Sequence, residues 1–341
     1  MIDFRYHIVS LIAVFLALAV GVVLGAGPLQ GSIGDQLTVQ IEQLRQEKEE
    51  LRVQLEQSQE RGEELGTFVD ATSQQLLEEM LTGVEVAVVE TADADGAMTE
   101  ALLERVAQAG GTVAGHVRLT QRWIDPADAA LRDATAKDLA AQMTVPPPAE
   151  TATSQVLGLV LGQALTQRDA TDVDQLSEVA SGFYGSLREA DLVAEQQAPT
   201  APADVVLVVA PAPVVDSDPD ASYLGIQTAT VTGLAGTNAV VAGTATGPGD
   251  LIAAIRANDE AAAAVSTVDS VDYVSGQITA VLALSALSRD AGPGHYGTSA
   301  DAESVLPVVP ELPEDDPHAD AEAEPTDGTD SGDDATEEAT E

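Results

Sequence analysis

The sequence predicts an α/β protein: a three-layer domain with a mostly parallel sheet, preceded by a transmembrane helix and a helical coiled-coil stalk and followed by a disordered acidic tail. Three observations predict this arrangement. Residues 8–29 form an uncharged apolar run, and residues 36–80 repeat apolar side chains at alternating spacings of four and three. Between residues 83 and 297, short runs of Val and Ala alternate with helical segments. Such alternation is typical of a sheet covered by helices on both faces.

Composition excludes several classes of function. The chain has 341 residues, and 57 acidic against 14 basic side chains give a net charge of −43. Nucleic acid is therefore an implausible partner, because phosphate binding requires a basic surface. No cysteine is present, so disulfides, thiol nucleophiles and thiolate metal sites are excluded. Aromatic residues make up 3% of the chain, which argues against an aromatic-lined sugar or nucleotide cleft.

The apolar run from Ile8 to Leu29 is long enough to cross a membrane. As a helix it would reach about 33 Å, against a bilayer core of roughly 30 Å. A cleaved signal peptide is the alternative, since the small residues at 25–27 would suit a signal peptidase. The run is longer than an ordinary signal core, and a helical pattern follows almost at once after Pro28. We therefore favour a retained single-pass anchor in the cell membrane.

Charge around the span predicts its orientation. Arg5 and the α-amine precede the apolar run, while the first charge beyond it is Asp35. Because basic residues stay on the cytoplasmic side, the N-terminus is expected in the cytoplasm and the remaining chain outside. If the helix were cleaved, the protein would be free to reach the outer envelope.

Small residues recur on one side of the apolar run, where Gly21 and Gly25 form a GxxxG motif. Such a motif lets two helices approach closely in lipid and favours self-association. The alternative is that membrane helices are simply rich in Gly and Ala.

The segment after the span carries a heptad pattern, the signature of helices that pair along a seam. One set of positions is Leu37, Leu44, Leu51, Ser58, Leu65 and Thr72; the other is Ile41, Lys48, Leu55, Gly62, Val69 and Leu76. Eight of these twelve residues are apolar. Because each helix hangs from a membrane anchor, the predicted coiled coil is parallel. The alternative is a single long helix that folds back onto the following domain.

Strands and helices of the α/β domain follow from local patterns. Strands are expected at 84–89, 112–119, 204–210 and 238–243, and helices at 97–109, 125–143, 152–166, 172–189, 220–234, 248–257 and 276–288. The strand at 112–119 alternates and places His116 and Arg118 on one face. Asp125-Pro126 is a typical helix start, with Asp as the N-cap and Pro as the first helical residue.

The C-terminal part of the chain is acidic and poor in apolar residues. No Lys or Arg follows Arg289, and residues 311–341 contain fourteen acidic side chains. This composition predicts disorder. The predicted boundaries are 1–7 for a cytoplasmic N-terminus, 8–29 for the transmembrane helix, 30–82 for the stalk, 83–297 for the exported α/β domain and 298–341 for the tail.

Catalytic signatures are missing from the sequence. It contains no GxSxG, P-loop, HExxH or strand-linked GxGxxG motif. The segment 243–250 could receive an anion at a helix start, but Asp250 is well placed to cap that helix itself. Asp269 and Asp272 could share a hard cation with a nearby carbonyl, with ordinary turn capping as the alternative. We therefore expect no enzymatic activity and no resident cofactor.

Several stretches together resemble the mycobacterial copper transport protein B family of actinobacteria. They are the N-terminal HIVSLIAVFLALAVGVVLGAGPL, AQAGGTV (107–113), VSTVDSVD (265–272), GQITAVLAL (276–284) and GHYGT (294–298). The resemblance covers most of residues 1–300 in order. It implies a role in copper homeostasis and efflux, with a pore in the outer envelope proposed for the mycobacterial namesake. His295 and Tyr296 lie in the last motif, although the resemblance transfers no copper ligand to either.

The favoured hypothesis is a non-catalytic envelope protein of copper homeostasis. As an oligomer, it could form a pore or act as an efflux component. Its expected partners are the lipid bilayer and further copies of itself, through the transmembrane helix and the stalk. Copper is expected as a transported ion, or one held loosely by tail carboxylates and His318. A non-catalytic scaffold that displays the α/β domain on its stalk is the alternative. An enzyme would need a deep pocket lined by His295 and paired carboxylates.

Overall fold

The computed structural model describes residues 4–26, 29–211, 221–244, 247 and 249–311. The chain divides into two compact units, residues 1–76 and residues 77–341. The first unit contains the apolar helix and nearly all of the long second helix, and the second unit contains the α/β fold.

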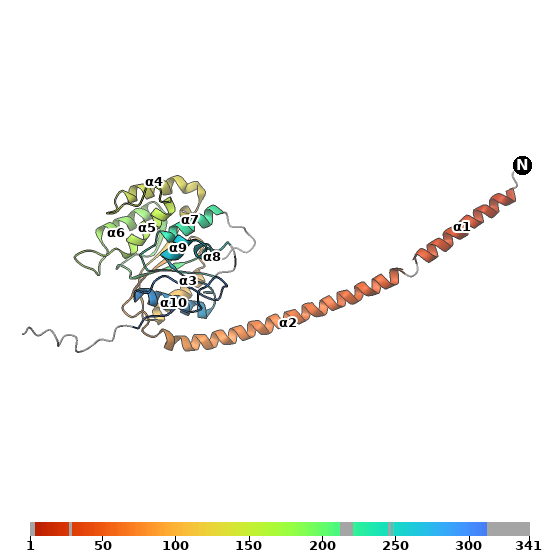
Figure 1. The fold of residues 1–341 in the computed structure, drawn as a ribbon, viewed down its shortest axis with the longest axis horizontal. Helices are drawn as coiled ribbons and strands as arrows, with labels where there is room; N and C mark the ends of the chain where they lie inside the picture. Colours follow the sequence, from red (N-terminus) through yellow and green to blue (C-terminus); the bar gives the residue numbers. More distant parts are fainter. Residues whose placement is uncertain (1–3, 27–28, 212–220, 245–246, 248, 312–341) are drawn as a thin grey trace, which may run out of the picture. The chain divides into compact units, whose positions relative to one another are not determined.

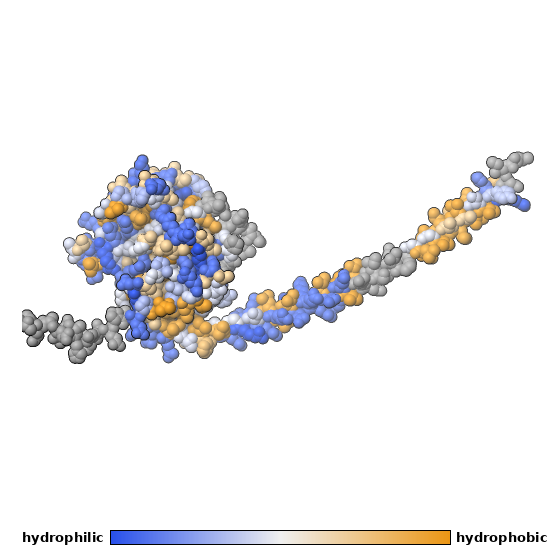
Figure 2. Space-filling view, in the orientation of Figure 1, coloured by the Kyte–Doolittle hydropathy of each residue, from blue (hydrophilic) through white to orange (hydrophobic). Residues whose placement is uncertain are grey.

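The first unit is helical in its described parts. Helix α1 (Phe4–Ala26) includes 22 residues, Phe4–Gly25, that are long and apolar enough to cross a membrane. Figure 2 shows α1 as a predominantly hydrophobic surface. Helix α2 (Leu29–Leu77) is a continuous helix of 49 residues. The predicted apolar helix is confirmed, and the predicted coiled-coil pairing of α2 stays a prediction.

A seven-stranded sheet forms the middle layer of the second unit. Its strands are β1 (Glu85–Glu90), β2 (Thr112–Leu119), β3 (Val193–Gln197), β4 (Val205–Val209), β5 (Ala239–Ala242), β6 (Ser266–Val268) and β7 (His295–Tyr296). They lie in the order β3-β2-β1-β4-β5-β6-β7, and only the β2–β3 pairing is antiparallel. The expectation of a mostly parallel sheet is confirmed.

Helices cover both faces of this sheet, as Figure 1 shows. One outer layer contains α4 (Ala129–Ala140), α5 (Thr153–Thr166), α6 (Glu178–Glu189), α7 (Ala221–Thr232), α8 (Leu251–Arg256) and α9 (Asp259–Ala264). The other contains α3 (Gly96–Gln108) and α10 (Val274–Ser288), which pack against each other and against the sheet. The predicted three-layer α/β arrangement is therefore confirmed.

Capping side chains explain where several helices begin. Asp95 accepts a hydrogen bond from the Ala97 amide at the start of α3, and Ser177 accepts one from Ala180 at the start of α6. Such side chains satisfy amides that have no partner within the helix. The Ser177 cap places the start of α6 later than predicted. Asp125 caps only a short 3-10 turn, η2 (Pro126–Asp128), so the helix predicted from residue 125 begins as α4 after this turn.

Close contact between α5 and α7 organises the larger helical layer. A Cβ atom added to Gly158 would lie 2.0 Å from the carbonyl oxygen of Thr230. One added to Gly233, just after α7, would lie 2.2 Å from the carbonyl oxygen of Gln155. The two helices therefore touch through their backbones, which only glycine permits at these positions.

The folded unit extends beyond the predicted domain at both ends. Leu77 and Leu81 are fully buried, although both lie within the predicted stalk, residues 30–82. Residues 298–311 lie within the predicted tail, yet Ser304 forms a β-bridge with Tyr296, and Arg289 donates a hydrogen bond to the Pro310 carbonyl oxygen at 2.9 Å. The predicted disorder from residue 312 onward lies outside the described residues.

Candidate functional site

The topology of the sheet indicates where a ligand would bind. The strand order reverses between β1 and β4, because the chain moves to one side through β2 and β3 and to the other through β5, β6 and β7. In open α/β sheets, ligands bind outside the carboxyl ends of the strands at such a switch point. A ligand-binding site is therefore expected at this edge of the sheet, between β1 and β4.

The loop between β1 and α3 carries carboxylates at the switch point. Asp95 caps α3 through the Ala97 amide at 2.9 Å. Asp93 accepts hydrogen bonds from the Tyr223 hydroxyl at 2.9 Å and from Gln121 Nε2 at 2.7 Å. In nucleotide-binding sheets a glycine-rich loop at this place presents amides to a phosphate. Here the carboxylates disfavour an anionic ligand.

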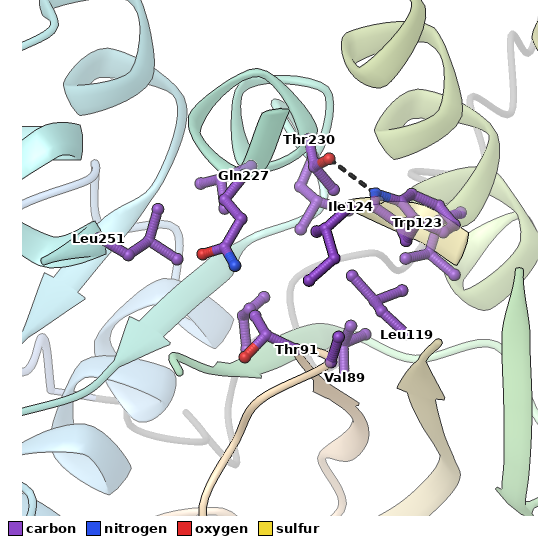
Figure 3. Close-up of a pocket in the computed structure, with 13 residues that line it drawn as sticks. Val89, Thr91, Leu119, Trp123, Ile124, Gln227, Thr230 and Leu251 are labelled. Atoms are coloured by element: carbon purple, nitrogen blue, oxygen red, sulfur yellow. Dashed lines mark hydrogen bonds between the residues drawn. The ribbon is translucent and has the colours of Figure 1, made fainter. Parts of the chain in front are cut away.

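A small cavity lies beside this loop, between the sheet and the larger helical layer (Figure 3). Val89 and Val208 form its floor, and Leu119 and Trp123 form one wall. Its enclosed volume is about 10 Å³, the room that one water molecule needs. The switch point is thus largely filled by the protein's own side chains.

Gln227 lines this cavity together with the polar residues Thr91 and Thr230. It is 4% exposed, and its side chain extends from α7 toward Thr91 (Figure 3). Among the described residues, neither its amide oxygen nor its amide nitrogen has a hydrogen-bond partner. Trp123 Nε1 donates a hydrogen bond at 2.8 Å to Thr230 Oγ1, which lies on the same helix as Gln227 (Figure 3). A buried amide costs free energy unless it is hydrogen-bonded, so a single water molecule is the occupant that this cavity fits.

A charged cluster occupies the same edge on the opposite face of the sheet. Glu90 ends β1 and is 2% exposed. One carboxylate oxygen lies 2.5 Å from His116 Nε2, and the other accepts a hydrogen bond from Arg118. The structure confirms that His116 and Arg118 share a face of β2 and adds Glu90 as their common partner. Because Arg118 neutralises the carboxylate, the cluster is built as an ion pair.

Asp269 belongs to a second, buried charged cluster beyond the end of β6. Its carboxylate accepts hydrogen bonds from Arg256 Nη1 at 2.9 Å, from Ser270 Oγ at 2.8 Å and from the Thr298 amide at 2.8 Å. Ser299 Oγ donates to the same group. Burial by itself raises the pKa of Asp269, but hydrogen bonds from Ser299, Thr298, Ser270 and Arg256 outweigh it and lower that pKa.

The proposed cation pair of Asp269 and Asp272 does not form in this arrangement. Asp269 is 0% exposed and directed at Arg256, whereas Asp272 is exposed to solvent. A guanidinium supplies the positive charge that a hard cation would have supplied. Asp269 therefore acts as a structural carboxylate that binds Arg256 and the Thr298 amide.

His295 and Tyr296 join the same cluster through β7. His295 Nδ1 lies 2.9 Å from Thr267 Oγ1, and the Tyr296 carbonyl oxygen accepts a hydrogen bond from Arg256 Nη2 at 2.8 Å. Burial lowers the pKa of His295. Gly297 follows with φ +137°, and a Cβ there would lie 2.1 Å from the Asp269 carboxylate. The GHYGT motif therefore closes the sheet edge and lies outside the cavity at the switch point.

The remaining candidates contribute no side chain to either cluster. Gly21 and Gly25 are exposed on α1, and a Cβ added to either would meet nothing within 4 Å. Asp250 accepts hydrogen bonds from Ala253 N at 2.9 Å and from Gly247 N at 3.1 Å, so it caps α8 as expected. Within the described ranges, no group of three or more His, Asp or Glu side chains is placed to hold a metal ion.

Sequence reasoning missed Glu90, Gln227 and Arg256. For Glu90 a signal was available, because a charged residue ending a buried Val-rich strand requires a partner, and His116 and Arg118 follow on the next strand. Gln227 and Arg256 lie on helices without any distinguishing pattern, and their neighbours are known only once the helices are packed.

A family model and several named proteins match this chain over most of its length. A family model described as "Copper transport outer membrane protein, MctB" matches residues 1–307. Proteins named "Copper transporter MctB" from Mycobacterium tuberculosis and Mycobacterium bovis are each 30% identical over 323 residues, which cover 89% of this chain and 99% of the relative. The protein of the same name from Mycobacterium leprae is 34% identical over 321 residues, with the same coverage.

Proposed function

The chain belongs to the MctB family of copper transport proteins, and we propose that it is a membrane-anchored, non-catalytic envelope component of copper transport. One observation carries the proposal. The family match runs from residue 1 to residue 307, so it includes the apolar helix α1, the long helix α2 and the described α/β unit together. The copper role is therefore proposed for the complete arrangement and not for one domain of it.

Helix α1 supplies the anchor in this proposal. Its apolar side chains are exposed along its length in the single chain, as expected for a surface that contacts lipid. Arg5 precedes the uncharged run that begins at Ile8, and Asp35 is the first charge beyond that run, which supports a cytoplasmic N-terminus and an exported α/β unit. The protein would then act in the cell envelope, outside the cytoplasmic membrane.

Copper enters the proposal as cargo. With no cysteine in the chain, a thiolate site for Cu(I) is excluded, whereas carboxylate and imidazole groups suit Cu(II). His318 and the acidic side chains after residue 311 provide such groups without selectivity. The described residues contain one helix long and apolar enough to cross a membrane. A single helix cannot enclose a pore, so a conduit or efflux component would require several copies.

A scaffold function is the second candidate, and the length of α2 favours it. At 1.5 Å per residue, its 49 residues reach about 70 Å. A helix of this length can hold the α/β unit at a set distance from the membrane. On this reading, the chain would organise the envelope independently of copper.

Deletion of the gene in its own host separates the two candidates. We expect the deletion strain to stop growing at a lower copper concentration than its parent, to contain more cell-associated copper, and to recover when the full chain is restored. Zinc serves as the control metal, and its tolerance should stay unchanged. Unchanged copper tolerance would contradict the copper proposal. Envelope defects that appear without added copper would support the scaffold.

A further inference from the structure

The clearest unpartnered surface on the described residues is a row of leucines along α2. We define the α2 seam as the heptad positions a and d between residues 37 and 55 of α2: Leu37, Ile41, Leu44, Lys48, Leu51 and Leu55. Its apolar members are between 49% and 65% exposed in the single chain. Figure 2 shows hydrophobic patches along an otherwise hydrophilic α2. A row of this kind is buried only when a second helix packs on it.

We infer that the α2 seam pairs with the α2 seam of a second copy of this chain, as a parallel, in-register, two-stranded coiled coil. The residue types in the seam favour two strands. Leu37, Leu44 and Leu51 occupy heptad position d, and the β-branched Ile41 occupies position a. Leucine at d combined with β-branched residues at a favours two strands over three or four.

Charged residues beside the seam favour a parallel, in-register pair. Glu47 lies at heptad position g and Arg52 at the following position e. In a parallel, in-register pair, a g residue faces the e residue five positions later in the other helix, so Glu47 would meet Arg52 of the second copy. Within one helix, residues five apart do not face each other. These two charges therefore complement each other only across such a pair.

Lys48 favours one register and a low oligomeric state. It lies in the seam at position a, where a polar residue lowers stability but specifies the register and a low oligomeric state. In register, the two Lys48 side chains share one layer, between apolar layers formed by Leu44 and Leu51 of both copies. A register shifted by one heptad would place each Lys48 opposite Ile41 or Leu55.

Direction follows from the anchor, and this step alone rests on the proposed function. Both copies of α2 would leave the same membrane from their N-terminal ends, which makes the pair parallel. Farther along, Ser58, Gly62 and Gly66 interrupt the pattern, and glycine costs about 1 kcal/mol in a helix interior. The paired segment is therefore residues 37–55.

The chain lacks cysteine, so single substitutions place unique crosslinking sites on the full-length protein in membranes. We expect Leu44→Cys and Leu51→Cys each to form a disulfide-linked dimer under mild oxidation with diamide. Gln46→Cys, on the outer side of the same helix at position f, is the matched control and should yield at least about tenfold less. Two differently tagged copies expressed together should appear in one product.

Each alternative gives a distinct result. An antiparallel pair could join at most one of the two seam sites to itself. A product containing one copy and another protein would overturn the inference, and so would equal yields at Leu44 and Gln46. Because crosslinking needs no copper, its failure in a strain that retains copper tolerance would contradict the coiled coil and leave the copper proposal standing.

A charge reversal in the Leu44→Cys chain tests the register. Arg52→Glu should lower the crosslinking yield about twofold, because it places two glutamates opposite each other. In a chain that also carries Glu47→Arg, the same Arg52→Glu change should raise the yield, since it restores an opposite-charge pair. An effect of the same sign in both backgrounds would overturn the in-register arrangement.

Discussion

Arg256 and Asp269 form the most deeply buried ion pair among the described residues, with side chains 3% and 0% exposed. The pair ties the residues after β7 to the sheet, because Ser299 and Thr298 also donate to Asp269. Removing one charge from a buried pair leaves the other uncompensated, at a cost of about 3–5 kcal/mol. Arg256 keeps Asp301 at 3.2 Å, so the lower end of that range applies.

We therefore predict that Asp269→Asn lowers the free energy of unfolding of the α/β unit by about 3 kcal/mol. Asp272→Asn, three residues away and exposed, is the control and should change it by less than about 0.5 kcal/mol. Trp123 is the single tryptophan and is fully buried, so its fluorescence during urea unfolding reports this unit. Equal effects of the two variants would show that the buried pair contributes no stability.

His295 predicts how stability depends on pH. Burial lowers the pKa of its imidazole below the ordinary 6.5, so the unfolded chain binds the proton more tightly than the folded one. The stability that neutral His295 contributes is present above pH 6.5 and is lost as the pH falls through its lowered pKa. Between pH 7.5 and 5.5, we therefore expect protonation of this residue to lower the free energy of unfolding.

The measurement compares the parent chain with His295→Asn, which keeps a hydrogen-bonding group toward Thr267 but does not titrate. Urea midpoints at pH 7.5 and 5.5, again from Trp123 fluorescence, should fall less in the variant. Other titrating groups cancel in this comparison. Parallel pH profiles for both proteins would contradict the prediction.

At the scale of elements, the close packing of α5 on α7 predicts that replacing Gly158 by alanine destabilises the α/β unit. Gly158→Ala would place a methyl group 2.0 Å from a backbone oxygen of α7, which cannot move like a side chain. Overpacking of this kind costs about 1–3 kcal/mol. Because the oxygen belongs to Thr230, the partner of Trp123, the native fluorescence should change as well.

Gly182→Ala on α6 is the matched control. A Cβ added there meets nothing within 4 Å, so alanine should raise stability by up to about 1 kcal/mol through its helix propensity. The two changes have the same chemistry and opposite predicted signs. Destabilisation by both variants would mean that open space at the glycine does not decide the outcome.

Elements with a strong local pattern were predictable, and elements defined by their partners were not. Strands β1, β2, β4 and β5 lie close to their predicted positions because they are Val-rich and bounded by turns. Strand β6 has three residues and β7 has two, and each exists only because a neighbouring strand pairs with it. The polar strand β3 pairs antiparallel at the sheet edge, where few apolar residues are needed.

At the scale of the whole molecule, the order of parts was predictable and the polar clusters were not. Apolar periodicity separates α1, α2 and the α/β unit along the chain. The Glu90 cluster joins β1 to β2, and the Asp269 cluster joins α8, β6 and β7. Both depend on strand order and register, which local patterns do not contain. The same reason separated Asp269 from Asp272 despite their proximity in sequence.

The orientation of the whole chain in the membrane gives the last prediction. We expect Val145→Cys, 78% exposed on the α/β unit, to react with a membrane-impermeant maleimide while the cytoplasmic membrane is intact. Phe4→Cys, 77% exposed at the start of α1, should react only after lysis. Basic residues resist translocation, so Arg5 keeps that end inside. Labelling of Phe4→Cys in intact cells would reverse the topology. A mature chain that carries the Val145→Cys label and lacks residues 1–26 would show that α1 is a cleaved signal.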